Sequence, residues 1–183
     1  MRVFVVVAAL LMVGLVTLEG SRAAFTATTT NGVNNFAAGT VVLSDDDAGG
    51  VMFNLANMAP GTTTTRCINV TYTGSLTSDV KLYGVVGGSG LATYLDTVIT
   101  VGTGAAGGAG FGCAGFTPTS VLHSNTLANF GATYTNYGTG LAGFVGATNP
   151  TTRSYQVAVT VQNNNAAQGL NATATFTWEA QNV

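Results

Sequence analysis

Short stretches in which apolar and polar residues alternate recur along this chain, and they limit its fold more than any other feature. In 155–161 every second residue is Tyr or Val, and in 172–178 the even positions carry Ala, Ala, Phe and Trp while the odd positions carry Thr. A period of two puts one side of an extended strand against a core and the other side in water. Helical periodicity is nearly absent beyond the N-terminal region. The pattern therefore predicts antiparallel strands with one buried face.

The predicted strands are short and are bounded by Gly, Asn, Asp or Pro. The clearest are 40–43, 51–55, 65–72, 80–86, 97–101, 155–162 and 172–180. Strands of this kind without the spacing of β-α-β units predict an all-β fold, an antiparallel β-sandwich of jelly-roll type. Segments 91–95 and 125–130 could form short helical turns. The glycine-rich stretch 102–112 lacks the Lys and the strand-loop-helix context of a phosphate-binding loop, so we expect a loose surface loop pinned by Cys113.

The N-terminus has the pattern of a secretory leader. Arg2 precedes a run without charges, 3–18, and Ser21, Arg22 and Ala23 follow with small residues at the positions that a signal peptidase reads. We therefore expect residues 1–23 to be a signal peptide cleaved between Ala23 and Ala24. The alternative is an uncleaved membrane anchor, but the apolar run of about 16 residues is shorter than the roughly 20 that a spanning helix needs.

The segment after the leader has the composition of a free β-strand and carries no catalytic group. It comprises Ala24, Phe25, Thr26, Ala27, Thr28, Thr29 and Thr30. An unpaired strand at the start of a mature protein is suited to pairing with a neighbour. The sequence thus predicts an N-terminal strand and linker over 24–38 and a sandwich domain over 39–183.

Charged residues are scarce in the roughly 160 residues beyond the leader, which suffice for one domain with its own core. The cations are Arg66, Lys81 and Arg153, and the acids are Asp45, Asp46, Asp47, Asp79, Asp96 and Glu179. This set cannot form a basic stripe, so we expect no nucleic-acid partner. No second apolar run approaches spanning length, so we expect no membrane partner once the leader is removed. A surface poor in long charged side chains is suited to packing against copies of itself.

Two cysteines, Cys67 and Cys113, remain in the exported part. In an oxidising compartment such a pair most often forms one disulfide. It would close a loop of about 46 residues and contribute on the order of 3–4 kcal/mol to stability by loop entropy.

Three blocks of residues carry a resemblance to a known family. They are 24–31 with 36–43, the turn Asn57, Met58, Ala59, Pro60, Gly61 after Phe53, and 155–161 with 165–170 and 176–180. In their order and spacing they resemble the TasA/camelysin family of secreted bacterial fibre proteins, whose members are often exported with a dedicated, W-type signal peptidase. The cysteine pair and the low lysine content fit an actinobacterial-type branch.

The resemblance implies a secreted subunit that assembles into fibres or pili of a biofilm matrix or cell surface. In that picture the strand Ala24–Thr30 of one subunit fills a groove in the sheet of the next, with Phe25 as its apolar anchor and the step from Asn31 to Gly32 as a hinge. An open sheet edge has unsatisfied N–H and C=O groups that such a segment can pair. The expected partner is another copy of the chain, with room for an accessory protein that anchors or nucleates the fibre.

A camelysin-like metalloprotease is the enzymatic alternative. Zinc proteases need an H-E-x-x-H helix or another set of three or more ligands with a general base. The chain has a single histidine, His123, with no carboxylate within twenty residues on either side, and it lacks a Gly-x-Ser-x-Gly motif. We therefore expect no catalytic residues, no metal and no cofactor, and His123 to be a polar residue at a strand or turn edge.

Two further patterns have a functional and a plain interpretation. The acidic run 45–47 could hold Ca²⁺, but it lacks the spacing and closing Glu of an EF-hand, which favours a solvated turn. Asn69 and Asn171 match the N-glycosylation pattern but fall in or beside predicted strands, which favours chance matches.

A second non-enzymatic hypothesis is a monomeric cell-surface adhesin or glycan-binding sandwich, which would need exposed aromatic side chains. Tyr134, Tyr137 and Phe144 are the candidates for such a patch, although packing over the end of a sheet explains them equally well. Trp178 alternates in phase with Phe176 and is expected in the core.

Overall fold

The computed structural model describes residues 37–147 and 150–183, and Ala38–Val183 forms one compact unit. The predictions for the leader 1–23 and for Ala24–Thr30 therefore lie outside the described residues. The strands are β1 (Leu43–Asp45), β2 (Thr63–Tyr72), β3 (Ser78–Gly87), β4 (Leu95–Thr103), β5 (Thr117–Thr126), β6 (Leu141–Gly146), β7 (Thr151–Val161) and β8 (Thr173–Asn182). The helical elements are η1 (Leu91–Tyr94), α2 (Leu127–Thr133) and η2 (Asn165–Ala167).

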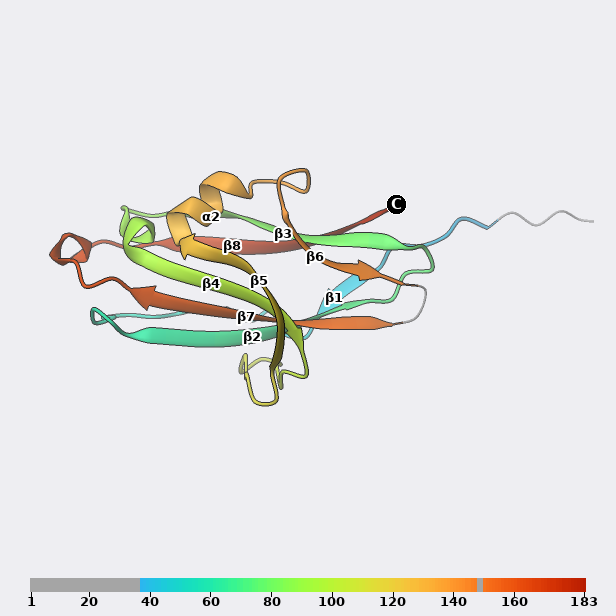
Figure 1. Cartoon of the computed structure of the whole chain (residues 1–183), viewed down its shortest axis with the longest axis horizontal. Coiled ribbons are helices and arrows are strands. Elements are labelled where there is room, and N and C mark those ends of the chain that lie inside the picture. Colours follow the sequence, from blue (N-terminus) through green and yellow to red (C-terminus); the bar gives the residue numbers. More distant parts are fainter. Residues whose placement is uncertain (1–36, 148–149) are drawn as a thin grey trace, which may run out of the picture. The chain divides into compact units, whose positions relative to one another are not determined.

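Two antiparallel sheets form the unit, which confirms the predicted all-β sandwich (Figure 1). One sheet has five strands in the order β1-β2-β7-β4-β5, and the other has three in the order β6-β3-β8. Each pair of neighbouring strands is antiparallel. The strands β2 and β7 pair along ten residues of each, which makes them the centre of the larger sheet together with β4.

The core lies between the two sheets and is built by the alternation seen in the sequence. In β7 the side chains of Tyr155, Val157, Val159 and Val161 are buried, while the residues between them are only partly buried. Facing positions on β2, β3 and β4 supply Ile68, Val70, Leu82, Ile99 and Val101. Burial of apolar surface at about 25 cal/mol per Å² is the main force that holds such layers together.

The helix α2 covers one end of the core. Its N-cap residue Thr126 accepts a hydrogen bond from Asn129 N at 3.2 Å, which satisfies one of the free amides of the first turn. Leu127 and Phe130 point from the helix into the core and are at most 5% exposed. The two predicted helical turns thus correspond to η1 and to the start of α2.

Several strand predictions differ from the structure. The strand predicted at 40–43 is β1 instead, which shares only Leu43 with it, and the strand predicted at 51–55 is irregular backbone. Ala48, Gly49 and Asn57 on either side of this segment adopt positive φ, which interrupts extended backbone. The strands β5 and β6 were missed because both lie at sheet edges and lack a clear apolar alternation.

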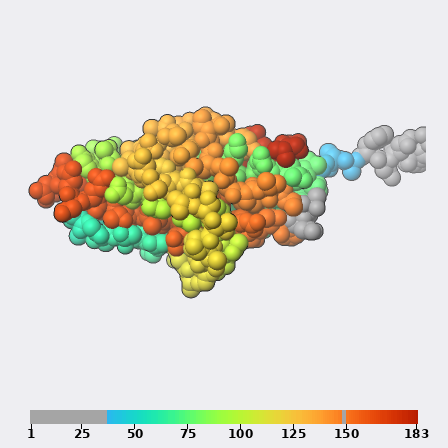
Figure 2. Space-filling model, viewed as in Figure 1, coloured from blue at the N-terminus to red at the C-terminus, as the bar shows by residue number. Residues whose placement is uncertain are grey.

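The glycine-rich stretch forms a loop pinned by Cys113, as predicted, but the loop is ordered rather than loose. Residues 104–116 connect β4 to β5 and project beyond the sheets as the yellow lobe of Figure 2. Within them Gly107 and Gly112 form an antiparallel bridge, and Ala106 N donates to Ala114 O at 2.9 Å. The loop is thus an ordered hairpin-like structure.

Candidate functional site

The edge strand β8 is the longest uninterrupted edge of the smaller sheet. It pairs with β3 over all ten of its residues without a register shift, and no strand of the described residues lies on its other side. An unpaired strand presents a row of N–H and C=O groups that can accept another strand. The free edge of β8 is therefore a place where an extended segment could add.

The edges β5 and β6 are less suited to accept a strand. The strand β5 contains Pro118, which has no N–H, and its pairing with β4 shifts register twice. The strand β6 has six residues, and its pairing with β3 shifts register between Val80 and Lys81. Proline, bulges and short length are the features by which natural sheets blunt their edges.

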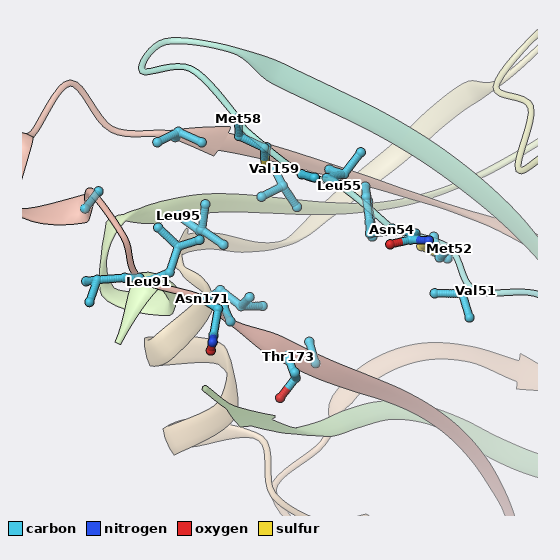
Figure 3. Close-up of a pocket in the computed structure, with 18 of the residues that line it drawn as sticks. Val51, Met52, Asn54, Leu55, Met58, Leu91, Leu95, Val159, Asn171 and Thr173 are labelled. Carbon is cyan, nitrogen blue, oxygen red and sulfur yellow. The ribbon is translucent and has the colours of Figure 1, made fainter. Parts of the chain in front are cut away.

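A large apolar groove opens beside β8, between the two sheets. Its volume is about 1050 Å³, which is in the range of ligand-binding cavities. The lining includes Ile68 and Val159 of the larger sheet, Leu95 at the start of β4, Phe176 and Trp178 of β8, and Met58 of the segment before β2. Figure 3 shows the labelled side chains Val51–Met58 along one wall and Asn171 and Thr173 beside β8 on the other.

The outer wall of the groove is the segment 51–58, which runs between β1 and β2. Its ends are fixed by hydrogen bonds from Gly50 N to Asp47 O at 3.0 Å and from Gly61 N to Val161 O at 2.7 Å. Val51 is 73% exposed and Leu55 is 38% exposed, although both are large apolar side chains. The groove is thus bordered by apolar surface that still faces water, which is typical of an interaction site.

Trp178 lies where the groove meets the closed core. Its ring packs edge-on against Tyr155, with 5.3 Å between ring centroids. Tyr155 is fully buried, and burial raises the pKa of its phenol. Trp178 was expected in the core, and it does face the space between the sheets, but it is only partly buried because that space is open at β8.

The single histidine was expected to be a polar residue at a strand or turn edge. It lies on β5 but is buried, with 4% of its surface exposed, and contacts Phe130 and Tyr134 with ring centroids 5.6 Å and 5.7 Å away. Its Nε2 is 3.3 Å from Thr126 O. Burial lowers the pKa of His123, which favours the neutral ring.

The acidic run forms a turn after β1, as the plain interpretation predicted. Asp45 Oδ1 accepts from Asp47 N at 3.4 Å, and Asp47 Oδ1 accepts from Gly49 N at 2.7 Å. Burial and the neighbouring Asp47 raise the pKa of Asp45. Asp46 differs because its carboxylate accepts from Asn69 N and Gly108 N at 2.9 Å and 2.8 Å.

The residues that a metalloprotease would need are not brought together in the described part of the chain. Over 37–147 and 150–183 there is no group of three or more His, Cys, Asp and Glu side chains that could hold a metal ion. His123 faces aromatic rings, and the carboxylate of Asp46 is occupied by N–H donors. The side chains described here do not fit a zinc site.

The two candidate glycosylation sites lie in different environments. Asn69 is on β2, and its side chain bonds Asp46, Ala105 and Ser154. Asn171 precedes β8 in an exposed turn, where its Oδ1 accepts from Ser89 N at 2.9 Å.

The three aromatic residues proposed as an exposed patch pack against neighbours. Tyr134 contacts Phe130, and Tyr137 donates to Asp79 O at 3.1 Å. The guanidinium of Arg153 lies 5.9 Å from the Phe144 ring centroid. All three are partly buried and do not form one platform.

Sequence reasoning missed the groove because it assigned 51–55 to a strand. The signal was present as a cluster of apolar residues, Val51, Met52, Phe53, Leu55 and Met58, between two positions of left-handed backbone. In the structure these residues wall the groove instead of joining a sheet.

Comparison with known proteins agrees with the resemblance read from the residues. The family model of camelysin metallo-endopeptidase matches residues 2–87, a range that contains Ala24–Thr30, β1, the groove wall, β2 and β3. A search of curated proteins gave no match. None of the helices in the described residues is long and apolar enough to span a membrane. The resemblance to the TasA/camelysin family is thus confirmed: over residues 2–87 this chain matches the camelysin family.

Proposed function

We propose that this chain is a non-enzymatic structural subunit that is secreted and assembles into extracellular fibres of a biofilm matrix or cell surface. In each joint, segment Ala24–Thr30 of one copy adds to the free edge of β8 in the next copy. The observation that supports this most directly is the apolar groove beside the free edge of the ten-residue strand β8.

The chemistry of the donor segment matches the groove. Its seven residues, at about 3.3 Å each, span roughly 23 Å, which is shorter than β8. Their side chains carry no charge, so burial of these side chains against apolar walls has no cost of desolvating an ion. Alternation puts Phe25, Ala27 and Thr29 on one side of the strand. Phe25 facing the groove would supply the main apolar contact, near Phe176 and Trp178.

Donation of this kind is head-to-tail. Each subunit uses two different surfaces, its own N-terminal strand and its own groove, so the contact is heterologous. A heterologous contact that does not close into a ring produces a filament. The low charge of the chain beyond the leader, three cations against six acids, gives little repulsion between stacked copies.

The non-enzymatic part of the proposal rests on the arrangement of side chains rather than on the family description. A catalytic zinc needs three protein ligands and an open position. The one histidine of the chain is enclosed by Phe130 and Tyr134 and lies outside the matched range 2–87.

Negative-stain electron microscopy with matched variants tests the proposal. The chain beginning at Ala24 is compared with one that lacks Ala24–Thr30 and with Ala174→Glu, which places a charge in the groove at an exposed position of β8. The control is Thr177→Glu, because Thr177 does not line the groove and alternation turns it to the outer face of the same strand. We expect filaments from the first chain and the control only.

Each other outcome has a definite meaning. Filaments from the truncated chain or from Ala174→Glu would refute strand donation into this groove. Monodisperse particles from every chain, with folding verified by circular dichroism, would refute assembly. That result would shift the assignment to a monomeric adhesin or glycan-binding sandwich.

A further inference from the structure

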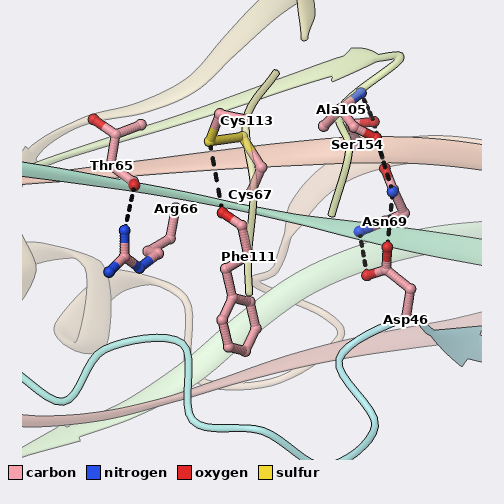
Figure 4. The surroundings of a disulfide bond; sticks show 9 residues. All are labelled: Asp46, Thr65, Arg66, Cys67, Asn69, Ala105, Phe111, Cys113 and Ser154. Carbon is pink, nitrogen blue, oxygen red and sulfur yellow. Dashed lines mark hydrogen bonds between the residues drawn. A yellow bond between two sulfur atoms is a disulfide. The ribbon is translucent and has the colours of Figure 1, made fainter. Parts of the chain in front are cut away.

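The sandwich has a second strand edge on its open side, the edge of β2 that faces β1. We infer that Asp46, Arg66 and the loop 104–116 close this edge and thereby restrict strand addition to β8. The inference rests on the proposed function, since it specifies which edge receives the donor. The groups involved are drawn in Figure 4.

The strand β1 covers only one end of β2. The register pairs Leu43, Ser44 and Asp45 with Tyr72, Thr71 and Val70, and the pairing stops there. Seven residues of β2, 63–69, therefore continue past the end of β1. In a strand the N–H and C=O of every second residue point to the same side. Thr73 N donates to Val42 O on this side, so the groups of Asn69, Cys67, Thr65 and Thr63 face it as well.

Three of these four positions, at Asn69, Cys67 and Thr65, are taken by groups that are not part of a strand. Asn69 N donates to Asp46 Oδ1 at 2.9 Å, and Cys67 N donates to Phe111 O at 2.9 Å. At the third position Arg66 Nη1 donates to Thr65 O at 3.3 Å. A side-chain carboxylate, a loop carbonyl and a guanidinium thus occupy the places where an incoming strand would bond.

The loop that supplies Phe111 is held down at several points. The disulfide joins Cys113 of the loop to Cys67 of β2 directly beside the bonded amide. Gly108 N donates to Asp46 Oδ2 at 2.8 Å, so Asp46 connects the loop to the strand. The Phe111 side chain is buried with 5% exposure and belongs to the core. Loss of any one of these contacts, such as the disulfide, would therefore leave the other contacts holding the loop against β2.

A buried polar network fixes the base of the loop. Asn69 Nδ2 donates to Asp46 Oδ2 at 2.8 Å and to Ala105 O at 3.1 Å. Ser154 Oγ donates to Asn69 Oδ1 at 2.6 Å and accepts from Ala105 N at 3.1 Å. Gly107 has a positive φ, and a Cβ there would overlap the Asp46 carboxylate. The chain thus places glycine where the loop must approach Asp46 most closely.

The asymmetry between the two edges follows from these contacts. On β8 no bulge, proline or paired loop interrupts the free edge. On β2, Asn69 N, Cys67 N and Thr65 O are bonded within the subunit. A subunit with two open edges could accept two strands or pair with itself, and it would form sheets instead of a filament of single width.

The test opens the edge of β2 in the full chain beginning at Ala24. The opened variant is Asp46→Ala with Cys67→Ala and Cys113→Ala. The control is Asp45→Ala with the same two cysteine changes. It loses the same charge and the same disulfide but leaves the acceptor for Asn69 N intact. Hydrogen exchange, negative-stain microscopy and light scattering on a sizing column are measured for both variants and for the unmodified chain.

We expect the amides of Cys67 and Asn69 to be protected in the unmodified chain. In the opened variant, exchange of the Asn69 amide should be about tenfold faster than in the control, the factor for one lost hydrogen bond. The amide of residue 67, which is alanine in both variants, should also exchange faster once the loop has lost its bond to Asp46. We expect single-width filaments from the control and laterally joined ribbons from the opened variant. Rapid exchange of both amides in the unmodified chain would overturn the inference even if the opened variant did not fold.

The outcomes separate this inference from the proposed function. Filaments of equal width from both variants would overturn the closed edge and leave strand donation standing. Absence of filaments from the unmodified chain, together with dimers or larger species from the opened variant alone, would refute the function and support the closed edge. Monomers from all chains would refute both.

Discussion

At the residue scale, the chemistry of individual side chains depends on neighbours that are distant in sequence. His123 is followed by Asn125 and Thr126, which suggested an edge position, yet strand pairing and α2 enclose it with Phe130 and Tyr134. Asp46 belongs to an acidic run, yet its carboxylate bonds two segments 23 and 62 positions away. Sequence showed that metal ligands were scarce. It could not show these contacts, because they arise from tertiary folding.

The burial of His123 predicts a dependence of stability on pH. The pKa of His123 is lowered in the folded state, whereas in the unfolded chain this side chain has its ordinary pKa of about 6.5. As pH falls through about 6.5, the unfolded state gains the proton first, so the free energy of unfolding should fall until the lower folded pKa is reached. One proton limits the slope to about 1.4 kcal/mol per pH unit. Above the pKa that His123 has in the unfolded chain, the ring is neutral in both states and this loss of stability is absent.

Urea denaturation between pH 7.5 and 5.5 measures this effect, with His123→Gln as the comparison. Glutamine does not titrate and can still donate to Thr126 O. No other histidine in the chain titrates in this window. We expect the free energy of unfolding to fall with pH in the unmodified chain and to stay level in the variant. Equal slopes in both proteins would contradict a buried, neutral His123.

At the element scale, alternation predicted the strands with a clear period of two and failed for segments whose structure depends on their pairing partners. The regions of β2, β3, β4, β7 and β8 followed from period two. The segment 51–55 has strand composition but no partner, because Asp46 and Phe111 occupy the edge of β2 beside it. The strands β5 and β6 form by pairing despite weak patterns. Whether a segment forms a strand depends on a second segment that pairs with it, and the pattern within one segment does not identify that partner.

The turn before the groove wall gives a prediction for this element. Ala48 has φ 55°, a left-handed conformation that costs a residue with a Cβ about 1–2 kcal/mol relative to glycine. Ala48→Gly should therefore raise the free energy of unfolding by up to about 1 kcal/mol, after the larger entropy of the unfolded glycine chain is counted. Ala56→Gly, within the same segment, should lower it by roughly 0.5–1 kcal/mol. Thermal and urea unfolding measure both effects. A loss of stability with Ala48→Gly would contradict a left-handed backbone at Ala48.

At the scale of the whole molecule, composition and alternation predicted a sandwich, but they could not say which side would stay open. That depends on a five-plus-three division of the described strands, which leaves β8 with a neighbour on one side only. It also depends on the loop 104–116, whose glycines suggested looseness and which instead covers β2. The cysteine pair was predictable from the exported context. Its place at the edge of β2 was visible only in the folded chain.

Head-to-tail donation also predicts how filament length changes when complete and truncated subunits are mixed. A copy that lacks Ala24–Thr30 keeps its groove but cannot donate, so it ends a filament wherever it binds. Adding one such copy to ten complete ones should shorten filaments several-fold, because each end that captures it stops growing. The same truncated copy carrying Ala174→Glu can neither donate nor accept and should leave the length distribution unchanged. Filament lengths measured from micrographs compare the mixtures that contain the truncated copy with and without Ala174→Glu. Equal shortening by both copies would indicate assembly through another surface, because only the first retains an intact groove beside β8.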